Sequence, residues 1–261
     1  MTHQDKPRHL LETACFSGPS SLDDTEHNLR VMEEAIAAAR KKGVQFLVFG
    51  EAFLTGFEGL AFNYWADSMK ALALDGPEIS RIRGWAKEQS MALAFGFHEI
   101  DDERIYSSYL ALDRKGEIRG HYRRISKGWK PRNFHQEEYR EGRVFPTFTL
   151  EGIRMTPLIC GDLWEDHLLM DIIDRDLETD LFLWPVHCDY PVEEWHESIY
   201  EEYRERSQIL ARPVLFVNNF IEEEGRAKGG AYLWHLGREL HGLPYGTPGL
   251  LEGIRIGPAR G

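Results

Sequence analysis

Four short apolar runs limit the folds open to this chain. They are QFLVF at 45–49, MTPLIC at 155–160, LFLWPV at 181–186 and VLFVN at 214–218. Runs of this kind, without regular polar alternation, are typical of strands covered on both faces. Segments with helical patterns lie between them, so we expect a sheet with helices packed on both sides.

The rest of the pattern adds further strands and helices. Strands are expected at 10–16, 91–97, 105–113, 117–125, 152–160 and 213–220, with short ones in GAYLW and LLEGIRI, and helices from Asp23 or Asp24 to Lys42 and over 78–89, 165–178 and 192–211. The fold class is therefore α/β, either a mixed sheet or an αββα layered arrangement. Because no repeat or linker divides the chain, residues 1–261 are expected to form one domain.

Composition narrows the class of protein. The net charge of −12 lacks the basic footprint of a nucleic-acid-binding protein. The three cysteines, Cys15, Cys160 and Cys188, form no CxxC pair and make a poor disulfide framework. The first ten residues are polar, and no apolar run approaches the about 18 residues of a membrane span. We therefore expect a reduced, cytoplasmic protein with neither nucleic-acid nor membrane partners.

Cys160 ends an apolar run in LICGDLWED, residues 158–166. A cysteine attacks as its thiolate, so a nucleophile here needs a base or a nearby cation. Gly161 would let a substrate approach the backbone closely, and N–H groups after Cys160 could stabilise an oxyanion. The alternative is that Cys160 only fills the core, as free cysteines often do.

Two other residues could serve that cysteine. Glu51 follows the buried run FLVFG, where a desolvated carboxylate suits a general base; the alternative is an exposed glutamate in a loop or at a helix start. Lys127, in RRISKGWK, lies just past a strand and could hold an oxyanion; the alternative is a solvated surface lysine. Ligands in α/β folds gather at the carboxyl ends of strands, where Glu51, Cys160 and the segment after Val186 lie.

Five segments, in this order, resemble the nitrilase superfamily of carbon–nitrogen hydrolases. They are VQFLVFGEAFLTGF (44–57), GEIRGHYRRIS (116–126), PLICGDLWED (157–166), RSQILARPVLFVNN (206–219) and GGAYLWHLGREL (229–240). The resemblance implies a four-layer αββα sandwich, with Glu51 as general base, Cys160 as nucleophile and a lysine as the catalytic cation. It also implies a homodimer or larger homo-oligomer, formed through helices outside the sandwich.

The chain departs from the family pattern at the lysine. The pattern reads YRK, whereas this chain has Tyr122, Arg123 and Arg124. Arg124 occupies the lysine position by direct spacing, and strand alternation places it on the same side as Tyr122. We nevertheless expect Lys127 to point at the Cys160 sulfur, because a guanidinium is bulky beside a compact oxyanion and Gly128 allows the chain to turn inward. Arg124 remains the alternative.

The family's second glutamate is also displaced. Strict spacing to Gly142 lands on His135, and we favour Glu138, beside Tyr139, over Glu137 as the acid that supports the site. The alternative is that both acids are only loop charges. By resemblance, His187 and Asp189 are candidate substrate-pocket residues. Trp164 is a candidate to line that pocket, with core packing as the alternative, whereas Trp184 is expected in the core. His187, Cys188, Asp189 and His196 match no tight zinc spacing, so we expect no metal and no cofactor.

The expected activity is hydrolysis of a small linear amide through an acyl-enzyme. Glu51 would take the thiol proton, Cys160 would attack the carbonyl carbon, and Lys127 with the N–H after Cys160 would hold the oxyanion. Nitrile hydrolysis by the same residues is one alternative. The other is a non-catalytic binding protein on the same scaffold, which the missing lysine favours and the intact Glu51 and Cys160 oppose.

Overall fold

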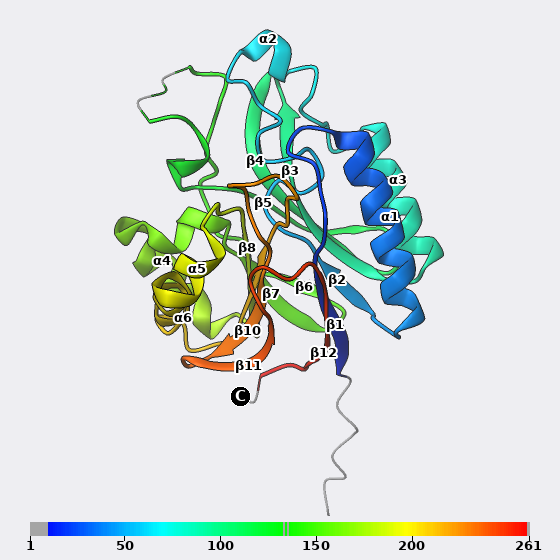
Figure 1. Cartoon of the computed structure of the whole chain (residues 1–261). Helices are drawn as coiled ribbons and strands as arrows, with labels where there is room; N and C mark the ends of the chain where they lie inside the picture. The colour runs from blue at the N-terminus through cyan, green and yellow to red at the C-terminus, as the bar shows by residue number, and fades with distance from the viewer. Residues whose placement is uncertain (1–9, 133, 135, 260–261) are drawn as a thin grey trace, which may run out of the picture.

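Two six-stranded sheets pack face to face in the computed structural model, which describes residues 10–132, 134 and 136–259 (Figure 1). The first sheet has the order β12-β1-β2-β3-β4-β5 and the second the order β11-β10-β9-β8-β7-β6. The strands are β1 Leu11–Ser17, β2 Phe46–Val48, β3 Ala92–Asp101, β4 Arg104–Leu112, β5 Ile118–Arg123, β6 Phe148–Leu150, β7 Ile153–Pro157, β8 Leu181–Val186, β9 Val214–Asn218, β10 Ala231–His235, β11 Arg238–Leu243 and β12 Gly249–Ile256.

Both sheets are mixed. Strands β1, β2 and β3 run parallel, as do β7, β8 and β9, and the remaining neighbours pair antiparallel. The expected antiparallel pair β4–β5 is confirmed. The carboxyl ends of parallel strands from the two sheets meet: the Glu51 N–H after β2 donates to the Val186 carbonyl of β8 at 3.4 Å, and the Ser17 hydroxyl of β1 donates to the Asn218 carbonyl of β9 at 2.8 Å.

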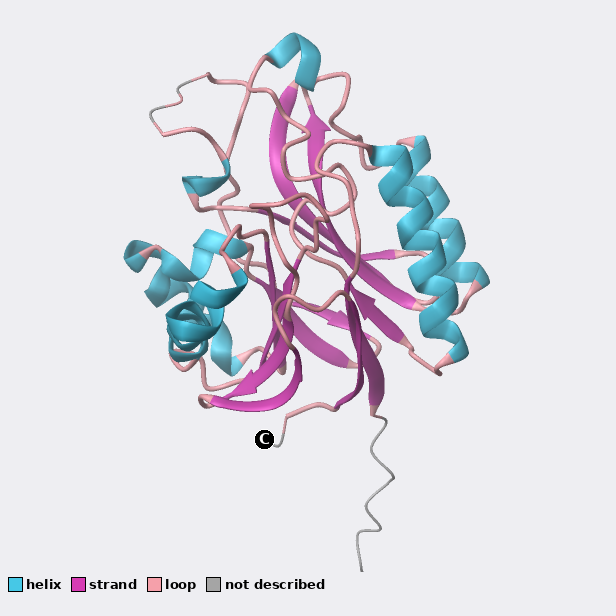
Figure 2. Ribbon diagram, viewed as in Figure 1, coloured by secondary structure: helices cyan, strands magenta, loops and turns pink. Residues whose placement is uncertain are grey.

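Helices cover the two outer faces of the sheets (Figure 2). On the first sheet these are α1 Thr25–Lys41 and α3 Pro77–Glu88, and on the second α4 Leu169–Asp174, α5 Val192–Glu194 and α6 Tyr200–Ser207. Asp24 caps α1 by accepting a hydrogen bond from the His27 amide at 2.9 Å, which confirms the expected helix start. The layers are therefore helix, sheet, sheet, helix, and the expected αββα sandwich is confirmed.

Burial on both faces is clearest in β2. Phe46 and Val48 belong to the core between the two sheets, whereas their neighbour Leu47 packs in the core under α1 and α3 with Leu29. Successive side chains of a strand point to opposite faces, so a strand between two cores needs apolar residues at every position. That requirement explains the uninterrupted apolar run in the sequence.

Several expected elements differ from the structure. The helix expected at 165–178 consists of α4 between two short 3₁₀ turns, and the helix expected at 192–211 ends at Ser207 and contains a π-helical stretch, Trp195–Ile199. The strand expected at 152–160 ends at Pro157, so Cys160 lies beyond it. The sequence analysis missed α2 Tyr64–Asp67, which is too short to show a helical period.

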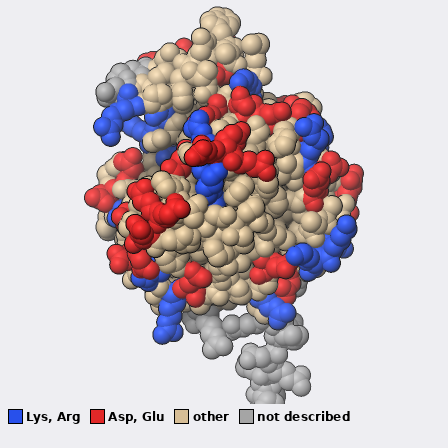
Figure 3. Space-filling model, viewed as in Figure 1, with Lys and Arg blue, Asp and Glu red and all other residues tan. Residues whose placement is uncertain are grey.

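Two expectations concern membrane-spanning helices and surface charge. Across the described ranges, no helix combines the length and the apolarity that spanning a membrane requires. On the face drawn in Figure 3, acidic and basic side chains of the described residues are interspersed, in keeping with a net charge of −12 spread over the surface.

The buried side chain of His98 is expected to make the folded state less stable as the pH becomes mildly acidic. It lies on β3, is 3% exposed, and its Nδ1 is 3.1 Å from the Thr55 hydroxyl. Burial lowers the pKa of His98 to about 4, against an opposing effect of Asp67. Between pH 6.5 and 4, His98 binds a proton more readily in the unfolded chain than in the folded one. The stability that comes from keeping His98 neutral is therefore complete above pH 6.5 and is lost as the pH falls toward 4.

We expect His98 to account for roughly 2–3 kcal/mol of stability lost between pH 7 and 4.5. Urea unfolding at both pH values measures this loss in the wild type and in His98→Gln. The variant should be less stable at pH 7 but lose less on acidification. His167→Gln, at an exposed position, is the matched control. Equal losses in the wild type and His98→Gln would contradict the prediction.

Candidate active site

Three segments, each following a different strand, bring Glu51, Arg124 and Cys160 together. Glu51 follows β2, Arg124 follows β5 directly, and Cys160 lies just past β7. Glu51 and Arg124 are 1% and 2% exposed, and Arg124 Nη1 lies 2.6 Å from Glu51 Oε1. Glu51 Oε2 is buried and has no hydrogen-bond partner within the described structure. One carboxylate oxygen is thus held by the guanidinium, and the other is available to accept a proton.

Cys160 is the partly exposed cysteine of the three, since Cys15 and Cys188 are buried. Its backbone adopts φ = 44°, a left-handed conformation that is strained for a residue with a side chain and that occurs at functional sites. Burial and then the charge of Glu51 raise the pKa of the Cys160 thiol to about 12, while Arg124 lowers it in part. The resting thiol is therefore protonated, so attack requires a base nearby.

Asp162 ties the Cys160 turn to the end of β5. Its carboxylate is fully buried and accepts hydrogen bonds from the Tyr122 hydroxyl at 2.6 Å, the Ser126 amide at 2.8 Å and the Ile159 amide at 2.7 Å. Two of these donors come from β5 and the segment after it. The sequence analysis missed this role, because an aspartate that follows a strand also suits an ordinary turn.

Trp184 holds the turn from the other side. It is fully buried, as expected for a core residue, and its indole N–H donates to the Cys160 carbonyl at 3.0 Å. Trp164 is 38% exposed and packs edge-on against Tyr203, with the Arg206 guanidinium over its ring. Trp184 thus has a second function, positioning Cys160, which the sequence did not reveal.

His187 and Asp189 lie beside the backbone of Glu51. The Asn219 amide donates to the Glu51 carbonyl at 2.7 Å and lies 3.0 Å from His187 Nδ1, which must therefore accept. The proton is then on Nε2, 3.2 Å from Asp189 Oδ1, while Phe57 stacks on the imidazole. This pair extends the polar site outward from Glu51.

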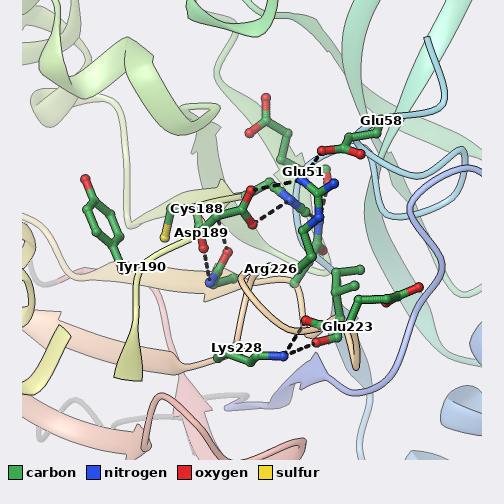
Figure 4. A network of polar contacts seen from close by, with 12 residues as sticks. Glu51, Glu58, Cys188, Asp189, Tyr190, Glu223, Arg226 and Lys228 are labelled. Atoms are coloured by element: carbon green, nitrogen blue, oxygen red, sulfur yellow. Dashed lines mark hydrogen bonds and ion pairs between the residues drawn. The ribbon is translucent and has the colours of Figure 1, made fainter. Parts of the chain in front are cut away.

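Arg226 continues this network toward the surface, and Figure 4 shows it reaching between Asp189 and Glu58. Its guanidinium forms an ion pair with Glu58 and lies 4.0 Å from Asp189. Burial opposes the charge of Asp189, but contacts that include His187 and Arg226 lower the pKa of its carboxyl overall. Three loops therefore meet at the outer end of the network.

Most of the chain matches a known protein family. The family model for the carbon–nitrogen hydrolases matches residues 13–242, which is most of the chain. The chain belongs to this family, within the nitrilase superfamily. The matched range includes Glu51, Arg124 and Cys160.

Relatives of this chain share limited identity with it. A bromoxynil-specific nitrilase of Klebsiella pneumoniae subsp. ozaenae is 30% identical over 116 residues, covering 41% of this chain and 32% of that protein. A cyanide hydratase of Botryotinia fuckeliana is 27% identical over 183 residues, covering 66% and 47%. The chain thus spans about a third to a half of the length of the curated relatives that it matches.

A solved structure matches nearly the whole length of the chain. An amidase from Nesterenkonia sp. superposes with a TM-score of 0.74 at 20% identity, covering 97% of this chain and 92% of that one. Another structure, of a mutant of the Nesterenkonia amidase, carries acrylamide added at its active-site cysteine. At this identity the likeness establishes the shared fold.

The structure corrects the expected placement of Lys127. Its side chain is exposed on a 3₁₀ turn, Lys127–Trp129, and lines a cavity of about 860 Å³ with Lys130 and Glu141. Arg124 contacts Glu51 instead. Strand alternation carries Tyr122 and Arg124 to the inner side. The bond from the Ser126 amide to Asp162 then fixes the chain before Lys127.

The acids near residue 138 do not reach this centre. Glu138 is half-buried, and within the described residues no hydrogen bond or ion pair joins it to Glu51 or Cys160. Glu137 is exposed and pairs with Arg140 at 3.5 Å. His135 lies outside the described residues. Glu141, which the sequence analysis did not single out, forms a nearly buried ion pair with Lys130.

Proposed function

We propose that this chain hydrolyses a small linear amide with Cys160 as nucleophile and Glu51 as general base. The observation that carries the proposal is the buried Glu51 carboxylate, which has one oxygen on Arg124 and the other unpartnered, and whose charge acts on the Cys160 thiol. A protonated thiol and a desolvated base in one site are what nucleophilic catalysis by cysteine requires.

The steps follow from those two groups. Glu51 takes the thiol proton as the Cys160 sulfur attacks the carbonyl carbon, and the carbonyl oxygen becomes an oxyanion held by a cation and the Gly161 N–H. Glu51 then returns the proton to the departing ammonia or amine as the C–N bond breaks, leaving a thioester. Water, deprotonated by Glu51, attacks that thioester, and the acid leaves as the thiol is restored.

The surroundings of this centre supply the remaining parts of the proposal. His187 and Asp189, oriented by Asn219 next to Glu51, are our proposed substrate contacts. A role of Glu138 or Trp164 in the site, and assembly into a homodimer, remain predictions. An amide is preferred because the likeness to the amidase structure extends over nearly the full chain. Nitriles are the second candidate, because the curated relatives are named nitrilases and cyanide hydratases.

Ammonia release from paired substrates tests this proposal. We expect turnover of at least one short primary amide and little or none of the matching nitrile. Acetamide, propionamide, butyramide and acrylamide, each beside its nitrile, form the panel, with Cys160→Ala as the background control. Release from nitriles alone would favour the second candidate. Release from neither, together with an unreactive Cys160, would favour a binding protein.

A further inference from the structure

We propose that Arg124 is the catalytic cation of this site, with Nη1 holding Glu51 and Nη2 holding the oxyanion formed beside Cys160. This inference rests on the proposed thiol chemistry and assigns an arginine to a position where the family pattern has a lysine. It follows from the directions in which the guanidinium nitrogens point.

The guanidinium is fixed in two of its three directions. Its Nε donates to the Ser126 hydroxyl at 2.7 Å, and its Nη1 donates to Glu51 Oε1 at 2.6 Å. Ser126 is itself held, because its amide donates to the buried Asp162. A guanidinium is a rigid planar fork, so two fixed nitrogens determine the direction of the third.

The third nitrogen, Nη2, points at the residue that follows the nucleophile. A Cβ added at Gly161 would lie 2.5 Å from Arg124 Nη2, and one added at Gly128 would lie 3.1 Å from it. The two glycines thus leave room for the fork between them. Nη2 therefore lies next to Gly161, the residue whose N–H is expected to hold the oxyanion.

The charge on Arg124 is permanent within this environment. The groups that face it are Glu51 from the segment after β2, Cys160 and Asp162 from the turn after β7, and Tyr122 from β5. Burial opposes the charge, but Glu51, Cys160 and Asp162 outweigh burial and raise the pKa of Arg124. A lysine ordinarily loses its proton near pH 10.4, whereas arginine does not titrate in this range.

Arg124→Lys is the main test, because it keeps a charge beside Glu51 and so protects the fold. We expect amide turnover to fall at least tenfold at pH 7.5, and an alkaline limb to appear in kcat/KM between about pH 9 and 11 that the wild type lacks. The exposed Arg143→Lys is the matched control and should show neither change. A variant with the wild-type rate and an unchanged pH profile would overturn the proposal.

Truncation separates the two candidate cations. Arg124→Ala should lose roughly 10²- to 10³-fold in rate, as for a lost oxyanion donor, and added guanidinium chloride at millimolar concentration should restore part of it. Lys127→Ala should lose less than tenfold. The reverse order of losses, or the same loss without rescue in a folded Arg124→Ala, would assign the role elsewhere. Circular dichroism spectra and thermal unfolding of each variant establish that it is folded.

Addition of acrylamide to Cys160 tests Arg124 without any hydrolysis. The sulfur bonds to the β-carbon, the double-bond electrons move onto the carbonyl oxygen as an enolate, and the proton that Glu51 took from the thiol ends on the α-carbon. Because an oxyanion forms, Arg124→Lys and Arg124→Ala should slow the adduct measured by mass spectrometry. Unchanged adduct rates would overturn the inference, whereas rapid adduct formation by a wild type that hydrolyses no amide would reject only the proposed function.

Discussion

Cys160→Ala is expected to abolish amide hydrolysis while leaving the fold intact. The change removes the atom that forms the thioester, so no acyl-enzyme can form and ammonia release should fall to background. The sulfur sits at a partly exposed turn, and alanine keeps the Cβ, so the strained backbone at φ = 44° is unaltered. We expect the free energy of unfolding to change by less than about 1 kcal/mol.

Iodoacetamide labelling with peptide mapping provides the matching measurement in the wild type. Cys160 should label first, because it is partly exposed and has Glu51 beside it, whereas Cys15 and Cys188 are buried. Cys15→Ala is the control and should keep full turnover and the same labelling at Cys160. Faster labelling at Cys15 or Cys188, or turnover that survives in Cys160→Ala, would reject Cys160 as the nucleophile.

Much of the architecture follows from the sequence, because it is set by local patterns. The apolar run of β2 has both faces buried, and Asp24 caps α1 where the pattern begins. Helix interruptions were harder to anticipate. The stretch from Trp195 to Ile199 has a helical pattern, but packing of Trp195 against Tyr203 and Tyr245 accompanies a wider turn that periodicity does not show.

The site was predictable only where a residue lies within a few positions of the carboxyl end of an expected strand. Glu51 and Cys160 fit that rule, but the choice between Arg124 and Lys127 depended on the path of the chain after β5. That path is set by Asp162, a residue that is distant in sequence from Ser126 and binds its amide. The sequence analysis explained the missing side chain of Gly161 by substrate approach alone. The structure shows that Gly161 also leaves room for Arg124, since a side chain there would collide with the guanidinium. Such long-range steric matches leave no local pattern.

Glu51→Gln is expected to lower amide turnover by roughly 10²- to 10⁴-fold, the range for loss of a general base. The upper end applies if Glu51 serves both acylation and deacylation. Glutamine keeps the size of the side chain, and its amide oxygen can still accept the hydrogen bond from Arg124 Nη1. The variant should therefore fold with the same site geometry, and kcat with a short primary amide measures the loss.

The same substitution should make the Cys160 thiol more acidic, which a purely structural role for Glu51 would not do. Burial and then the Glu51 charge raise the pKa of Cys160, and Arg124 lowers it, so removing the carboxylate leaves burial alone to oppose Arg124. Iodoacetamide labelling against pH should have a lower midpoint in Glu51→Gln than in the wild type, even as turnover is lost. Glu58→Gln, at the half-exposed partner of Arg226, is the control and should leave the midpoint unchanged. Near-wild-type turnover in Glu51→Gln, or a midpoint that moves upward, would show that Glu51 is not the base facing Cys160.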